Sequence, residues 1–402
     1  MDAGRVWISF ITLSRYEAAV IMSDKSTNVM TNEIIYRRIV VKLGTNLLTG
    51  GTGRLDPTIM ASLVAQIAVV AGRGVEVLLV TSGAIAAGKE KLGGVYKKAK
   101  DIPYKQVLAS VGQSRLMNIY DDLFSVHDLT VAQALLTRAD LNDRSGYLNA
   151  RNTMLALMEL GVITIVNEND VVAVDEIRDA KFGDNDNLSA MVANLVDADL
   201  LLILTDLEGL FSANPRIVKD AQLIPLVEKI TPEIERLAGG TLSTAATGGM
   251  VTKLEAAKLA TASGVRVVIA SGMETAIIER IVCGEKLGTH FPPQSEPDAR
   301  QRWLLSGLSA QGRIIIDDGA AKAVRRCSSL LPAGVTGVDG AFKRGDIVRL
   351  INHEGVQLGY GIANYDAAEV DIIKGAHSER IVEKLGHSYG DEVVHHNNLA
   401  SC

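Results

Sequence analysis

Five short apolar runs, separated by stretches of helical pattern, constrain the fold of this chain more than any other feature. They cover residues 39–41, 75–80, 162–166, 200–204 and 265–270, and each is rich in Val, Ile or Leu. Such strands have no polar face to turn to water, so they belong in a parallel sheet that helices cover on both sides. We therefore expect an α/β fold built on a parallel sheet.

The helix expected between the first and second apolar runs has clear signals at both ends. Asp56 can cap its start, and Pro57 fits the first helical turn, where a missing N–H costs nothing. Gly72 and Gly74 then favour an end just before the next strand.

A cluster of prolines divides the chain. Pro292, Pro293 and Pro297 are three of its nine prolines and fall close together. Because proline removes backbone donors and stiffens the chain, this composition predicts a linker, which we place at residues 286–307. The α/β domain would then span residues 38–285.

The segment after the linker has the sequence pattern of short strands and tight turns, and not that of alternating strands and helices. Short strand candidates at 312–317, 346–350 and 355–361 are separated by Gly and Asp turns. We expect a small β-rich domain over residues 308–386 and a tail over 387–402.

Composition excludes several classes of protein. No apolar run approaches the roughly 20 residues that cross a bilayer, and we expect residues 1–37 to form a flexible leader and not a signal peptide. A net charge of -6 argues against a strongly basic nucleic-acid surface. The three cysteines lie far apart, which fits a reducing cytoplasm, so we expect a cytoplasmic protein.

Polar and small residues follow four of the apolar runs. Lys42 and Gly44 come after the first, Ser82 after the second, residues 167–170 after the third, and Thr205 with Asp206 after the fourth. In a parallel α/β sheet, ligands bind at the carboxyl ends of the strands. These residues therefore predict a site along one edge of the sheet.

Residues 83–89 match the spacing of a phosphate-binding loop up to its lysine. The next residue is Glu90, where such a loop needs the hydroxyl of Ser or Thr. A carboxylate at that position repels phosphate, so we interpret the segment as a helix start with Lys89 in solvent.

Two other lysines are better placed for phosphate. Lys42 ends an apolar strand beside Gly44, although a strand-end lysine can also simply reach out to water. Lys253 lies near the start of a helix that follows a glycine-rich turn, where the helix dipole disfavours a cation unless an anion is bound.

Residues 183–187 place four short polar side chains in a row before another helix. Caps and turns account for some of them. Together with residues 167–170 they indicate a site that reads an amine and a carboxylate, or one that holds a magnesium ion.

In order and spacing, residues 41–45, 81–88, 167–170, 183–187 and 247–250 resemble the glutamate 5-kinase family of the amino acid kinases. The resemblance extends from residue 38 to about 386, and the segments 328–332 and 342–346 resemble a PUA domain. It implies an α/β amino acid kinase sandwich with a parallel sheet and a small C-terminal β-rich PUA-like domain. The implied reaction is ATP-dependent phosphorylation of the L-glutamate γ-carboxylate to L-glutamyl 5-phosphate, the first step of proline biosynthesis, with ATP and Mg²⁺ as cofactors.

The resemblance also implies roles for single residues, although it identifies no metal ligands. Lys42 and Lys253 would contact the ATP phosphates, and Asp186 would orient both lysines. Glutamate would be bound by Ser82, Asp170, Asn185, Asp184 and Asn167. ATP would be bound by Lys42, Gly44, Thr205, Asp206, Thr247, Gly248, Gly249, Met250, Val251, Thr252 and Lys253.

Expectations about partners follow from the same resemblance. They are L-glutamate as substrate, a homo-oligomer (dimer or tetramer), functional coupling to glutamyl phosphate reductase, and proline as a feedback inhibitor. We expect no membrane or nucleic-acid partner.

Two alternatives stay open from the sequence. One is a kinase of the same superfamily that acts on another acid or on a nucleoside monophosphate. The other is an RNA-binding protein, because PUA domains elsewhere bind RNA. Residues 309–386 carry ten Lys or Arg and ten Asp or Glu, a net charge of zero, which does not favour a phosphate-binding surface.

Overall fold

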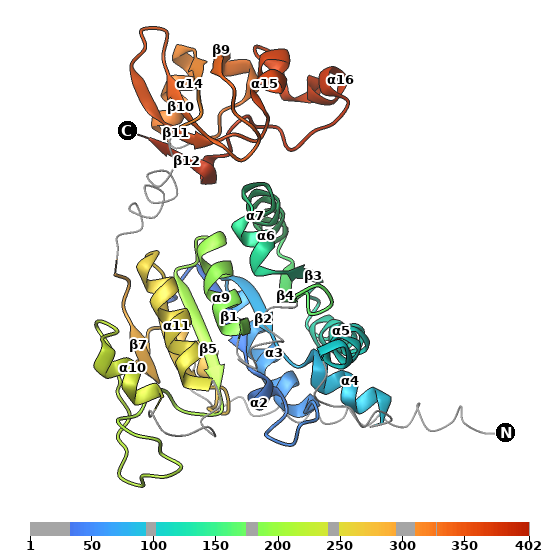
Figure 1. The fold of residues 1–402 in the computed structure, drawn as a ribbon, viewed down its shortest axis with the longest axis vertical. Helices are drawn as coiled ribbons and strands as arrows, with labels where there is room; N and C mark the ends of the chain where they lie inside the picture. Colours follow the sequence, from blue (N-terminus) through green and yellow to red (C-terminus); the bar gives the residue numbers. More distant parts are fainter. Residues whose placement is uncertain are drawn as a thin grey trace, which may run out of the picture.

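The chain folds into two units with separate hydrophobic cores (Figure 1). The computed structural model describes residues 33–93, 102–173, 184–239, 249–294, 310–326 and 328–401. The larger unit is an α/β domain, and the smaller is the β-rich unit drawn in orange to red.

A seven-stranded sheet with the order β3-β4-β2-β1-β5-β6-β7 forms the centre of the larger domain. Six of its strands run parallel, and β7 is antiparallel to β6. The bounds are β1 Arg38–Leu43, β2 Glu76–Thr81, β3 Val131–Leu136, β4 Ile163–Glu168, β5 Leu200–Thr205, β6 Arg266–Ser271 and β7 Thr289–Phe291. All five predicted strands are present, which confirms the parallel α/β sheet.

Helices cover both faces of this sheet. One face packs against α3 (Pro57–Gly72), α5 (Ile102–Ser125) and α12 (Ile277–Val282), and the other against α7 (Arg144–Glu159), α9 (Asp184–Leu195) and α11 (Gly249–Ala262). The remaining helices are α2 (Thr45–Leu48), α4 (Ala84–Leu92), α6 (Arg138–Asn142) and α10 (Pro232–Ala238). This double cover explains why the central strands carry apolar residues on both faces.

The predicted ends of the first long helix are confirmed. The Asp56 side chain accepts hydrogen bonds from the backbone N–H groups of Thr58 and Ile59, and Pro57 is the first residue of α3. Gly74, two residues after the helix, has a φ of +87°, which glycine adopts without strain.

Two glycines bring α4 and α5 into close contact. A Cβ atom at Gly88 would lie 1.9 Å from the carbonyl oxygen of Leu108, and one at Gly112 would lie 1.7 Å from that of Ala84. Any larger residue would force the helices apart. The glycine at position 88 is therefore explained by helix packing, without a phosphate loop.

The smaller domain is built on a five-stranded sheet with the order β12-β11-β10-β8-β9. Its strands are β8 Gly312–Ile316, β9 Val335–Gly340, β10 Ile347–Ile351, β11 Gln357–Ile362 and β12 Leu399–Ser401. The helices α14 (Asp318–Arg325), α15 (Ala367–Ile373) and α16 (Ile381–Leu385) pack with this sheet around one core. The predicted β-rich domain is confirmed.

The domain boundaries differ from the sequence expectation at three places. Residues 387–402 were expected to form a tail, but β12 pairs with β11, and both Val393 and Val394 are buried in the core of the smaller domain. Strand β7 belongs to the larger sheet although it lies inside the expected linker 286–307. At the end of the expected leader 1–37, Ile35 donates a backbone hydrogen bond to the carbonyl oxygen of Val282 at 3.2 Å. Residues 1–32 and 295–309 lie outside the described residues.

A buried arginine joins the two domains. Arg151, on α7, is 1% exposed, and its Nε donates to the Asn398 Oδ1 of the smaller domain at 2.9 Å. Its guanidinium also pairs with Asp197 and donates to the carbonyl oxygen of Leu195, both in the larger domain. Beside it, Leu148 forms an apolar cluster with residues of β10 and β11. In Figure 1, α7 lies on the side of the larger domain that faces the smaller one.

Across the described ranges, no helix is both long enough and apolar enough to cross a membrane.

The contact between the domains can be tested through Arg151. Arg151→Ala removes a buried cation and leaves Asn398 and the Leu195 carbonyl without their donor, so we expect a loss of about 3 kcal/mol in the free energy of unfolding. The control is Arg313→Ala, because the Arg313–Asp339 pair is half exposed on both sides and should contribute under about 1 kcal/mol. Urea denaturation measures both. Equal losses in the two variants would contradict the structural role of Arg151.

Candidate active site

An open cavity of about 690 Å³ lies at the carboxyl ends of β1, β2, β4 and β5. The chain passes from β1 to β2 on one side and reaches β5 on the other, so this is the point at which the strand order reverses. Ligands bind at such points in open parallel sheets. The cavity is lined by residues that the sequence singled out, among them Lys42, Gly44, Ser82, Asn167, Asp170, Asn185, Asp186, Thr205, Asp206, Gly249, Met250, Val251, Thr252 and Lys253.

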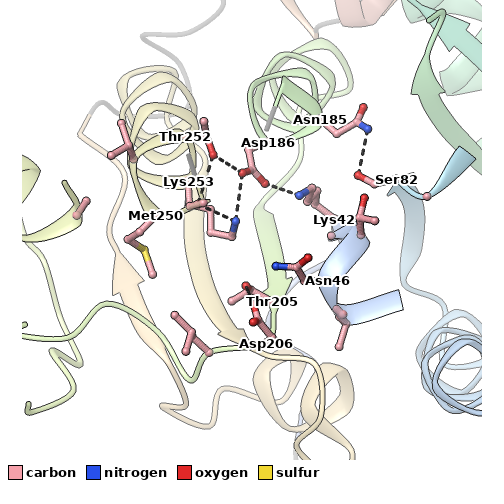
Figure 2. Close-up of a pocket in the computed structure, with 18 of the residues that line it drawn as sticks. Lys42, Asn46, Ser82, Asn185, Asp186, Thr205, Asp206, Met250, Thr252 and Lys253 are labelled. Atoms are coloured by element: carbon pink, nitrogen blue, oxygen red, sulfur yellow. Dashed lines mark hydrogen bonds and ion pairs between the residues drawn. The ribbon is translucent and has the colours of Figure 1, made fainter. Parts of the chain in front are cut away.

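The centre of the cavity holds one carboxylate between two lysines (Figure 2). The Lys42 Nζ lies 2.6 Å from the Asp186 Oδ1, and the Lys253 Nζ lies 3.3 Å from the Asp186 Oδ2. Thr252 donates its hydroxyl to the same Oδ2 at 2.7 Å. Lys42 is 4% exposed, Asp186 1% and Lys253 8%. Both lysines are thus held by protein contacts and do not reach out to bulk water, which rules out the alternative considered for Lys42.

Burial and charge oppose each other in this group. Burial raises the pKa of Asp186, but the Lys42 and Lys253 ammonium groups and two hydrogen bonds outweigh it, so the pKa lies below its ordinary value. Burial lowers the pKa of Lys253, and the Asp186 carboxylate offsets only part of that shift. Two ammonium groups around one carboxylate leave a net positive charge. Because an uncompensated buried charge is costly, the arrangement favours a bound anion.

The first turn of α11 places several predicted nucleotide residues beside this charge. Gly249 begins the helix, and its carbonyl oxygen accepts a hydrogen bond from the Lys253 Nζ at 2.8 Å. Met250 and Val251 line the same wall of the cavity. Thr247 and Gly248 lie outside the described residues.

The floor on the β5 side carries Thr205 and Asp206. The Thr205 hydroxyl donates to the Asp206 Oδ1 at 3.0 Å, and the Asp206 Oδ2 pairs with Arg216 at 2.6 Å. Arg216 was not predicted from the sequence, because it lies in a loop with no periodic pattern that would indicate where its side chain points.

Three amide and hydroxyl side chains form a hydrogen-bonded row on the opposite side. The Asn185 Nδ2 donates to the Ser82 Oγ and to the Asn167 Oδ1, each at 3.1 Å. Asn167 donates in turn to the Gln113 Oε1 at 2.7 Å. Asp184 is the first residue of α9, directly before Asn185. Both amide hydrogens of Asn185 thus point at protein oxygens.

Asp170 lines the cavity close to this row. Burial raises the pKa of its carboxyl to about 6. A partly buried carboxylate with no cation of its own in the described structure is suited to pairing with a cationic group of a ligand.

Lys89 has no part in the central group. It is an exposed residue of α4 on the cavity lining, and no ion pair joins it to Asp186 in the described ranges. Glu90 pairs instead with Arg115 of α5 at 3.0 Å. The interpretation of residues 83–89 as a helix start is thereby confirmed, since Gly83 is the N-cap of α4.

A protein cage for a metal ion is not found in the described ranges, because no three His, Cys, Asp or Glu side chains gather there. Magnesium in kinases is usually held by one or two carboxylates together with substrate phosphates and water. The donor set of this cavity fits a magnesium ion that arrives with a phosphate ligand.

The chain is similar in sequence to two known families and to several proteins of known function. The amino acid kinase family matches residues 37–271, and the PUA domain matches residues 312–385. The glutamate 5-kinase of Dehalococcoides mccartyi is 61% identical over 366 residues, which is 90% of this chain and 98% of that protein. Those of Shewanella pealeana and Moorella thermoacetica are each 51% identical, over 92% and 90% of this chain and 98% and 96% of their own lengths.

The two buried lysines give the first test of the site. Lys42→Ala and Lys253→Ala should each lower kcat for phosphoryl transfer by roughly a hundredfold or more, the scale of losing one preorganised electrostatic contact. Lys89→Ala is the matched control and should leave kcat nearly unchanged. Steady-state kinetics at saturating substrate would measure all three. An essential Lys89 with a dispensable Lys42 would contradict the assignment.

Proposed function

This chain belongs to the amino acid kinase family, and from that premise we infer that it is a glutamate 5-kinase. It transfers the γ-phosphoryl group of ATP to the γ-carboxylate of L-glutamate and forms L-glutamyl 5-phosphate, the first step of proline biosynthesis. The observation that supports this reaction most directly is the buried Lys42–Asp186–Lys253 group, with its net positive charge.

Phosphorylation of a carboxylate requires stabilisation of negative charge in the transition state and needs no general base. The γ-carboxylate of glutamate has a pKa of roughly 4.3 and is already ionised at neutral pH. The obstacle is repulsion between this anion and the phosphates, in a transition state that spreads negative charge over the equatorial oxygens. Lys42 and Lys253 would neutralise that charge, and Asp186 would keep both ammonium groups aimed at it.

We propose that ATP lies along the β5 and α11 side of the cavity. Gly44, Thr205, Asp206 and residues 249–253 would hold the nucleotide, and Lys42 and Lys253 would hold its phosphates. Magnesium would enter as part of the MgATP substrate and neutralise further phosphate charge.

We propose that glutamate lies on the β2 and β4 side. Asp170 would pair with the α-ammonium group, while the Ser82 hydroxyl would donate to a carboxylate oxygen. Asn167, Asp184 and Asn185 would complete the binding surface. The burial of Asp170 supports this, because a desolvated carboxylate gains most from an incoming cation.

Partners and location are proposals that follow from the family. We propose a homo-oligomer, a dimer or tetramer, that works in the cytoplasm. Coupling to glutamyl phosphate reductase is chemically reasonable, since an acyl phosphate is prone to hydrolysis. Proline carries an α-carboxylate and a cationic, secondary α-ammonium group, which supports feedback inhibition at the Asp170 side of the cavity.

Nothing in the fold or the comparisons favours the two alternatives. The relatives described above, which cover 90–92% of this chain, are glutamate 5-kinases. RNA binding has no support beyond the PUA domain itself.

Substrate choice tests the reaction. With MgATP and hydroxylamine, glutamate should give γ-glutamyl hydroxamate. Aspartate, one methylene shorter, should react about a hundredfold less, because its carboxylate falls short of the in-line position. N-acetylglutamate should fail because acetylation removes the cation that pairs with Asp170. Comparable turnover of N-acetylglutamate would contradict the assigned specificity.

The pKa of Asp170 predicts a pH dependence. Below about pH 6 the free carboxyl is protonated and cannot pair with the α-ammonium, so kcat/KM for glutamate at saturating MgATP should fall as pH drops through 6. Asp170→Asn should have a low kcat/KM at pH 7.5 and lack this step, while its KM for MgATP stays close to wild type. A step at pH 6 that persists in Asp170→Asn would show that another group titrates.

A further inference from the structure

We infer that Gln113, on α5, is a positioning residue that fixes the hydrogen-bond polarity of the glutamate side of the cavity. Gln113 lies outside the cavity lining and acts through Asn167 and Asn185. The inference rests on the proposed function, because it concerns how the α-ammonium group of glutamate is recognised.

The backbone N–H of Glu168 identifies which end of the Asn167 amide is the oxygen. The N–H of Glu168 can only donate, and it donates to the Asn167 Oδ1 at 2.9 Å. The other end of the Asn167 amide must therefore be its NH₂ group, which needs an acceptor. Gln113 supplies that acceptor through its Oε1 at 2.7 Å.

The same logic fixes Asn185. The atom that faces the Asn167 Oδ1 must be a donor, so it is the Asn185 Nδ2, which also donates to the Ser82 Oγ. Asn185 is left with its carbonyl oxygen, an acceptor that is buried and has no hydrogen-bond partner within the described ranges. Ser82 already accepts a hydrogen bond, so its own hydroxyl hydrogen is available to a ligand.

This polarity suits an amino acid. Asn185 and Asp170 both line the cavity, and the Asn185 Oδ1 is buried with no partner in the described ranges. A cation bound between these residues would satisfy both acceptors, whereas the Ser82 hydroxyl can donate to an anionic oxygen. A turned Asn185 amide would replace this acceptor with a donor and disfavour the α-ammonium group.

Gln113 prevents the side-chain amides of Asn167 and Asn185 from rotating. Asn167 is 2% exposed, so without an acceptor its NH₂ group would be buried and unsatisfied. Asn167 could relieve this only by rotating away from Glu168 and Asn185, and Asn185 would then lose its own constraint.

Close packing of α5 against α4 fixes the position of the Gln113 backbone. Its neighbour Gly112 lies against the carbonyl oxygen of Ala84, where a Cβ atom would clash. Seven residues further along α5, on the same face, the Tyr120 hydroxyl lies 2.7 Å from the Thr81 Oγ1, directly before Ser82. α5 therefore braces the ends of both β2 and β4.

Two substitutions separate positioning from general stability. Gln113→Met keeps the length of the side chain but cannot accept from Asn167, and it should raise KM for glutamate tenfold or more, the scale of misaligning hydrogen bonds to a charged group. The KM for MgATP should stay within about twofold. Gln113→Glu keeps an acceptor at the same place and should restore KM for glutamate to within about threefold of wild type. Asn118→Met, at an exposed amide of the same helix, is the control and should match wild type.

Glutarate, which is glutamate without its α-ammonium group, provides the decisive comparison. As a competitive inhibitor it should lose clearly less affinity in Gln113→Met than glutamate does, because glutarate has no α-ammonium group that needs the Asn185 acceptor. An equal loss for both ligands, or no loss for either, would overturn the role of Gln113. Failure of the wild-type protein to phosphorylate glutamate would instead contradict the proposed function.

Discussion

The buried contact between Asp186 and two lysines is the interaction on which the site depends. Lys42 comes from β1, Asp186 from α9 and Lys253 from α11, so three segments far apart in the sequence must meet for either lysine to be held. Neither lysine would stay buried, at 4% and 8% exposure, without the carboxylate. Since one carboxylate neutralises only one lysine, one positive charge remains, and it can be neutralised by the negative charge of a phosphoryl group during transfer.

Much of the fold could be predicted from the sequence, for a physical reason. Strands buried on both faces must be apolar throughout, so all five central strands were visible. β3 was missed because it is an edge strand whose residues alternate in exposure, and β7 because it has only three residues. The last residues of the chain were taken for a tail because the pairing of β12 with β11 depends on partners about 40 residues away.

Some residues of the site could likewise be predicted from the sequence, and others could not. Lys42 and Lys253 could be found because a lysine at a strand end or near a helix start is locally out of place. Asp186 stood among the short polar residues 183–187, and its role beside the lysines followed from the resemblance to the family. The role of Thr252 in holding Asp186, and those of Gln113 and Arg151, could not be found in this way. Gln113 and Arg151 are ordinary residues in the middle of amphipathic helices, and their function comes from partners 54 and 247 residues away in the sequence.

The central claim is that Asp186 aims both lysines at the transferring phosphoryl group, and Asp186→Asn tests it most directly. The measurement is kcat at saturating MgATP and glutamate, with nucleotide affinity determined separately by equilibrium binding. Asparagine keeps the shape but removes the charge that holds the lysines together, so the account predicts a fall in kcat on the order of 10²-fold or more, with a much smaller change in nucleotide affinity. A variant that keeps a kcat near that of wild type would contradict it.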